Sequence, residues 1–163
     1  MDAGVPSDVP RETQTIHVPP TRVESYREWA TDGTGLTAAA RVRDSDGRIA
    51  LVKNGWSDGW IAPGGAVEPS ETPADAARRE VYEETGLEAT VDEPILVLDQ
   101  TYVSEADSGV QFHAEFVLFA ASADGPIPDV DQLGVDSDEI TAAQWFETLP
   151  ENLHEDDLFR PYL

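Results

Sequence analysis

The chain contains no cysteine and a single lysine, Lys53, among its 163 residues. Without cysteine it can form neither disulfide bonds nor thiolate metal sites. No apolar run approaches the roughly 20 residues that a membrane-spanning helix needs. The first residues, MDAGVPSDVPRE, lack the basic start and the apolar stretch of a secretory signal. We therefore expect a cytoplasmic protein with no membrane partner.

Basic residues are scarce along the whole chain. Lysine and arginine total 10 against 33 acidic residues, which gives a formal net charge of -23. Binding to nucleic acid or to an anionic membrane surface needs clustered lysine and arginine, so we expect no nucleic-acid partner. A folded chain this acidic and this poor in lysine is typical of a halophilic organism, whose salt-rich cytoplasm screens the self-repulsion.

The remaining composition favours a folded domain. Hydrophobic residues make up 40% of the chain, with four tryptophans, five phenylalanines and apolar runs such as residues 116–119. A disordered acidic chain would be poor in such residues. The length suits one domain with one core. Residues 1–20 hold four prolines, and we expect them to form an extended or flexible arm before a single domain over 21–163.

Helical patterns occur in three places. Val23, Tyr26 and Trp29 share one helical face, which predicts a short helix over 22–30 opened by a capping box of Thr21 and Glu24. The strongest pattern covers 74–85, where Thr72 can cap the start, Pro73 suits the first position and Gly86 suits the end. A final helix is expected from about Pro150.

Strand-like runs lie on both sides of the central helix. We predict a hairpin of 36–43 and 49–53, and further strands at 88–91, 95–103, 112–120 and 142–146, with a loop over 121–138. Strands before and after a central helix, with another helix near the end, predict an α/β fold in which helices cover a mixed β-sheet.

Three carboxylates stand out on the central helix. Glu80, Glu83 and Glu84 lie at i, i+3 and i+4, so they share one face and repel one another. Arg79 borders them, but one guanidinium cannot neutralise three acids. Such a density of hard oxygen ligands suits Mg²⁺, Mn²⁺ or Ca²⁺. The alternative is a solvated acidic face on a helix of an acid-rich chain.

The loop before this helix contains Pro63-Gly64-Gly65. Two glycines let the backbone turn tightly and approach a ligand closely, and their carbonyls could complete a metal shell. A metal held there would lie beside phosphate oxygens of a substrate and could activate a water for in-line attack.

This segment resembles the signature of the Nudix family: Gly, five residues, Glu, seven residues, Arg-Glu-apolar, one residue, Glu-Glu, one residue, Gly-apolar. All nine positions match, and they hold Gly65, Glu71, Arg79, Glu80, Val81, Glu83, Glu84, Gly86 and Leu87. The flanking segments 60–65 and 143–150 also look like the family's. The resemblance is sharp over 60–87 and loose over about 36–155.

The resemblance implies an α/β/α sandwich and metal-dependent hydrolysis of the diphosphate bond in a nucleoside diphosphate linked to another moiety. Such substrates are nucleoside triphosphates, ADP-ribose and dinucleoside polyphosphates. By the same resemblance, Mg²⁺ or Mn²⁺ would be ligated by Glu80, Glu83, Glu84 and the Gly64 carbonyl. Glu71 and Arg79 would orient the carboxylates through a salt bridge. Nudix enzymes are often dimers, so a homodimer is compatible with the resemblance, but the sequence leaves the oligomeric state open.

The residue that takes the proton from the attacking water stays open in the sequence. Candidates are Glu84 itself, then Glu115 on a strand-like run, then Glu139; the alternative for the last two is a surface acid. His113 shares a strand face with Glu115 and could contact substrate, although an ordinary strand histidine has the same pattern. Aromatic residues that could stack on a base or pack in the core are Tyr102, Trp56 and Trp60.

Two other functions are compatible with the same fold. A nucleotide-sensing module would bind without cleaving, but such modules typically lose glutamates of the signature, and this chain keeps all four. An isomerase of the isopentenyl-diphosphate type usually needs a catalytic cysteine, which is absent. Substrate choice is expected to lie in the loops 54–59, 103–111 and 121–138.

Overall fold

One mixed β-sheet forms the centre of the computed structural model, which describes residues 4–55, 57–133 and 140–163. The strand order is β1-β5-β6-β2-β3-β7, and β4 pairs with β2. β1 runs parallel to β5 and β2 parallel to β6, whereas the other neighbours are antiparallel. The strands are β1 (Arg11–Val18), β2 (Leu36–Arg43), β3 (Ile49–Asn54), β4 (Gly64–Ala66), β5 (Thr90–Ser104), β6 (Gln111–Ser122) and β7 (Ile140–Phe146).

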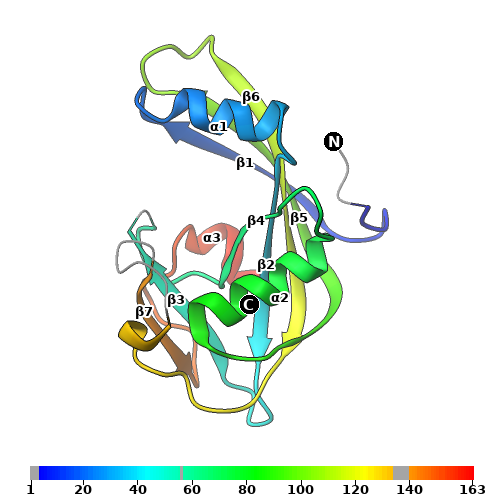
Figure 1. The fold of residues 1–163 in the computed structure, drawn as a ribbon, viewed down its shortest axis with the longest axis vertical. Coiled ribbons are helices and arrows are strands. Elements are labelled where there is room, and N and C mark those ends of the chain that lie inside the picture. Colours follow the sequence, from blue (N-terminus) through cyan, green and yellow to red (C-terminus); the bar gives the residue numbers. More distant parts are fainter. Residues whose placement is uncertain (1–3, 56, 134–139) are drawn as a thin grey trace.

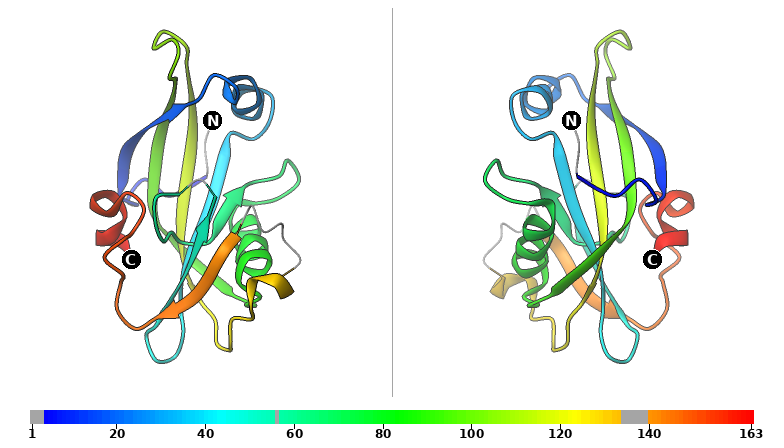
Figure 2. Two further views of the ribbon diagram at one scale, coloured as in Figure 1. Left: turned by 90° about the vertical axis from the view of Figure 1, so that its left-hand side faces the viewer. Right: turned by 90° about the vertical axis from the view of Figure 1, so that its right-hand side faces the viewer.

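Helices lie on both sides of this sheet. They are α1 (Val23–Thr31), α2 (Pro73–Thr85) and α3 (Asp156–Phe159), with short 3-10 turns η1 (Val130–Gln132) and η2 (Arg160–Tyr162). Figure 1 shows α2 in front of β2, and Figure 2 shows α2 and α3 on opposite sides of the sheet. The predicted α/β/α sandwich with a mixed sheet is confirmed. None of the helices in the described ranges is long and apolar enough to cross a bilayer.

Side chains alternate between the two faces of the strands, and this divides the core into layers. Val97 and Val117 pack with Ala77 and Val81 of α2, whereas their neighbours Leu98 and Leu118 pack in a second cluster with Phe159 of α3. Successive strand side chains point to opposite faces, so one pair of central strands supplies both layers. A third cluster lies farther along the same strands, where Ala30 of α1 meets Tyr102 and Phe112.

The ends of α2 follow the predicted capping pattern. The Thr72 hydroxyl accepts a hydrogen bond of 3.2 Å from the Asp75 N–H, and Pro73 begins the helix. Gly86 adopts the left-handed conformation with φ of 77°, and its N–H donates to the Tyr82 carbonyl. Glycine reaches this conformation without steric cost. These two caps fix where α2 starts and stops, whereas buried side chains such as Ala77 and Val81 set which face it turns to the sheet.

The segment predicted as an extended or flexible arm contains the edge strand β1. Residues 11–18 pair in parallel with β5, from Arg11 against Val97 to Val18 against Ser104. Gln14 and Val18 are buried on one face, while Arg11 and Thr13 on the other are exposed. The alternation typical of a strand is weak in this segment, because a buried glutamine replaces one of the expected apolar side chains.

The other boundary predictions were partly wrong. Arg22, with no side-chain cap, precedes α1, so the predicted capping box of Thr21 and Glu24 does not form. The end of the run 88–91 and the whole of the run 95–103 belong to one strand, β5, which begins at Thr90 and whose register shifts around Pro94. The last helix begins at Asp156, because hydrogen bonds with the backbone of Trp60 hold residues 152–154 in an extended bridge.

Candidate functional site

Arg79 connects the loop before α2 with the acidic face of that helix. Its guanidinium binds both carboxylate oxygens of Glu71, with Nε to Oε2 at 2.7 Å and Nη2 to Oε1 at 2.9 Å. Nη1 donates to Glu80 at 2.9 Å and to Glu83 at 3.2 Å, and Nη2 reaches the Ala66 carbonyl at 3.1 Å. One planar cation thus orients three of the four signature glutamates.

This network changes the acidity of its members. Hydrogen bonds from Arg79 lower the pKa of Glu71 to about 2, and the bonds to Glu71 and Glu80 raise the pKa of Arg79 above its usual value. Burial raises the pKa of Glu80, although Arg79 opposes the shift. Glu71 and Arg79 therefore form a fixed ion pair. Glu80 is partly removed from water, and Arg79, which it shares with two other glutamates, balances its negative charge only in part.

The double glycine lies between β2 and the acidic face of α2. Gly64 and Gly65 belong to β4, which pairs with Ala39 and Ala38 of β2. The Gly64 N–H donates to Glu84 Oε1 at 3.2 Å, and Glu84 is only 9% exposed. A Cβ on Gly64 would lie 2.5 Å from the Ala39 Cβ, and one on Gly65 would overlap the Glu80 carboxylate. The short strand β4, predicted as loop, thus brings backbone and carboxylates together.

The carboxylates suit a hard divalent cation by their chemistry. Across the ranges that the structure describes, no three Asp, Glu, His or Cys side chains converge closely enough to hold a metal ion. The contacts explain this, because Arg79 holds Glu80 and Glu83 while Glu84 accepts from the Gly64 backbone. Three of the four glutamates share Arg79 and the fourth, Glu84, pairs with a backbone N–H, so the group keeps an excess of negative charge. Carboxylate oxygens partly removed from water are the donors that Mg²⁺ and Mn²⁺ prefer.

Glu115, the first candidate downstream carboxylate, lies on β6 and contacts Arg11. It is 6% exposed, and its Oε2 accepts from Arg11 Nη1 at 3.3 Å, while the same nitrogen binds Asp99 at 2.9 Å. Its Oε1 is buried and has no hydrogen-bond partner. His113, on the same strand face, pairs with Thr101 at 3.3 Å. Arg11 and Asp99 were not predicted as site residues, although an acid within the apolar run 95–103 was a signal.

The aromatic candidates pack against other side chains. Tyr102 is 7% exposed and stacks on Phe112 at 5.2 Å and on Tyr26 at 5.7 Å between ring centroids. Its ring therefore belongs to the core under α1 and cannot lie against a base. Trp60 packs edge-on against Phe146 at 4.7 Å, and the Lys53 ammonium lies 5.0 Å from its ring centre. Trp56 and Glu139 lie outside the described residues.

Alanine at the two glycines should separate packing from carboxylate placement. Gly64→Ala forces the new methyl group against β2 backbone and should lower the free energy of unfolding by about 1–3 kcal/mol. Gly65→Ala meets only the mobile end of Glu80 and should cost less than about 1 kcal/mol, while displacing that carboxylate. Urea unfolding of both variants measures the difference. Equal losses of stability in the two variants would contradict this description of β4.

Comparison with known proteins agrees with the geometry. A model of the NUDIX domain matches residues 33–158. Diphosphoinositol polyphosphate phosphohydrolase 2 of Rattus norvegicus is 47% identical over 47 residues, 29% of this chain and 26% of that protein. A MutT-like protein of Streptomyces ambofaciens is 40% identical over 58 residues, 36% of this chain and 38% of that protein. The matches thus span well under half of these relatives.

Solved structures share the fold. A NUDIX hydrolase from Nitrosomonas europaea has a TM-score of 0.51 and 26% identity, over 68% of this chain and 70% of that one. A pyrophosphohydrolase of Bacillus subtilis has a TM-score of 0.54 and 24% identity, over 72% and 65%; at this identity it supports the fold alone. Because the domain model covers most of the chain and the complete signature lies on β4 and α2, the chain belongs to the Nudix family.

Proposed function

We propose that this chain is a metal-dependent pyrophosphohydrolase that cleaves the diphosphate bond of a nucleoside diphosphate linked to another moiety. The observation that supports this most directly is the ion-pair network in which Arg79 orients Glu71, Glu80 and Glu83 along one side of α2. An acidic helix face that only contacts solvent would not need an arginine whose guanidinium binds a glutamate of the preceding loop at two points.

In this proposal Glu80, Glu83, Glu84 and the Gly64 carbonyl hold Mg²⁺ or Mn²⁺. Such an ion, when bound, neutralises phosphate charge and lowers the pKa of an attacking water. Arg79 and Glu71 position the carboxylates, because the two-point bond between them fixes the guanidinium from which Glu80 and Glu83 are oriented. Glu84 is the first candidate to take the proton from the water, and Glu115 the second.

The charge of the protein favours a small nucleotide as the substrate. Candidates are a nucleoside triphosphate, ADP-ribose or a dinucleoside polyphosphate. The rat relative is named for diphosphoinositol polyphosphates, and a chain of net charge -23 repels such a ligand more strongly than a nucleotide with fewer phosphates. The acidic composition also leads us to propose a halophilic origin and cytoplasmic location, so assays belong in molar KCl. A sensing module is the alternative, and turnover distinguishes the two.

Removing one signature carboxylate should abolish turnover and spare the fold. Glu83→Gln and Glu84→Gln should each lower kcat at least about a hundredfold, because the neutral amide loses both affinity for the metal and basicity. Release of phosphate or nucleoside monophosphate from a panel of nucleotides, in molar KCl with Mg²⁺ or Mn²⁺, measures this. A chelator should stop the wild-type reaction.

Glu88→Gln is the matched control, because Glu88 is exposed and lies three positions after the last residue of α2. It should keep wild-type activity. Activity near the wild-type level in either Glu83→Gln or Glu84→Gln, or turnover that survives the chelator, would contradict the assignment of these carboxylates.

Arg79→Lys tests the positioning role of the guanidinium. Lysine keeps the charge but cannot bind Glu71 at two points while also reaching Glu80. We expect a roughly 10–100-fold loss of kcat and a raised requirement for Mn²⁺ in a metal titration. Arg78→Lys, which alters only an exposed pair with Asp75, should change neither quantity. If Arg79→Lys lost stability but no activity, the ion pair would be structural only.

A further inference from the structure

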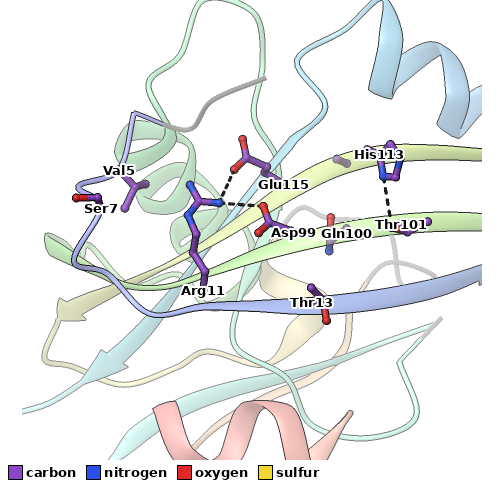
Figure 3. A pocket seen from close by; sticks show the side chains of 10 residues that line it. Val5, Ser7, Arg11, Thr13, Asp99, Gln100, Thr101, His113 and Glu115 are labelled. Carbon is purple, nitrogen blue, oxygen red and sulfur yellow. Dashed lines mark hydrogen bonds and ion pairs between the residues drawn. The ribbon is translucent and has the colours of Figure 1, made fainter.

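An open cavity of about 890 Å³ lies over β1, β5 and β6. Figure 3 shows it between the N-terminal segment that carries Val5 and Ser7 and the strands β1, β5 and β6. The strand residues that line it are mostly polar: Arg11, Thr13, Asp99, Gln100, Thr101, His113, Ala114 and Glu115. Most of these residues have no role in the activity proposed above. A cavity of this size suits part of a small molecule.

Glu115 supplies the strongest evidence that a ligand group belongs in this cavity. The residue is 6% exposed, and its Oε1 is buried without a hydrogen-bond partner. Its other oxygen already accepts from Arg11, which also binds Asp99, as the dashed lines of Figure 3 show. A buried carboxylate oxygen without a donor is costly. The missing partner is therefore a hydrogen-bond donor, and a ligand can bring one.

The charge of the cavity argues against a phosphate. Arg11 is shared between Asp99 and Glu115, so these three groups together are negative. The remaining polar lining groups are the hydroxyls of Ser7, Thr13 and Thr101, the amide of Gln100 and the imidazole of His113. Carboxylates with hydroxyl neighbours suit the hydroxyl groups of a sugar, as carboxylates that bind the ribose of dinucleotides do.

The cavity lies at a suitable distance from the signature loop. The Glu115 N–H donates to the Gly35 carbonyl, and the Val67 N–H donates to the neighbouring Leu36 carbonyl. Val67 follows β4 directly. Glu115 and the signature loop are thus two strand spacings apart, or about 10 Å. That separation is comparable with the length of a nucleoside 5′-diphosphate, so one substrate can reach both.

We propose that this cavity holds the ribose of the substrate and that Glu115 and Asp99 select ribonucleotides over 2′-deoxyribonucleotides. The assignment rests on the proposed function for its substrate class. The ribose hydroxyls donate to the unpaired oxygen of Glu115 and to Asp99. Arg11 is a positioning residue that holds the two carboxylates in place. A 2′-deoxyribose removes one donor and leaves a buried acceptor unpaired, which weakens binding.

Hydrolysis of ATP and dATP by the whole protein, in molar KCl with Mn²⁺, gives the first test. The wild type should favour ATP by at least about tenfold in kcat/KM. Glu115→Gln and Asp99→Asn should each bring this ratio at least about threefold closer to one. Because the Asp99 side chain is half-exposed, Asp99→Asn should fold even if the variant of the buried Glu115 does not. Asp92→Asn, an exposed acid on the same strand, is the matched control and should leave the ratio unchanged.

The same variants separate selection from proton transfer. If Glu115 served only as the proton acceptor, Glu115→Gln would slow ATP and dATP equally, and the unchanged ratio would overturn the proposal. A wild type that shows no preference would also overturn it.

A binding measurement that does not require turnover tests the ribose assignment independently of the proposed hydrolysis. Calorimetric titration of the intact protein with AMP and dAMP, in chelator, should show tighter binding of AMP, and the preference should shrink in Asp99→Asn. A protein that cleaves no nucleotide yet keeps this preference would refute the hydrolase and support the cavity assignment. Equal binding of AMP and dAMP would overturn the assignment.

Discussion

The bidentate ion pair between Arg79 and Glu71 is the interaction on which the proposed site depends. It ties the loop after β4 to α2 and leaves Nη1 of the same guanidinium to hold Glu80 and Glu83. Without it, neighbouring carboxylates on one helical face would repel one another into solvent. The arginine balances only part of their charge, and the remaining negative charge is what a divalent cation would neutralise.

The packing of α2 on the sheet also stabilises this arrangement. Val97 and Val117 face α2 through Ala77 and Val81, all of them small side chains, so the helix packs close to the strands. One step farther along the same strand face, Asp99 and Glu115 replace the valines. Along this face the apolar residues under α2 are therefore followed directly by polar residues that line the cavity. Strand alternation keeps both on one face, and this places the proposed ribose site beside the signature helix.

Local signals made much of this arrangement predictable. The spacing of Glu80, Glu83 and Glu84 defined the acidic face, and Thr72 and Gly86 defined the helix ends, because these features depend on only a few neighbouring residues. The ion pair between Glu71 and Arg79 followed from the family resemblance. By contrast, β1 was not predicted as a strand, since its pairing with β5 joins residues more than 80 positions apart and buries a glutamine. The contact of Arg11 with Glu115 depended on that pairing.

The location of a bound metal tests the central claim most directly. Crystals grown with Mn²⁺ and measured at the manganese absorption edge should show an anomalous peak coordinated by Glu80, Glu83 and Glu84, with Glu71 still paired to Arg79. A peak elsewhere, or carboxylates that keep their contacts with Arg79 and the Gly64 backbone at saturating Mn²⁺, would contradict the account.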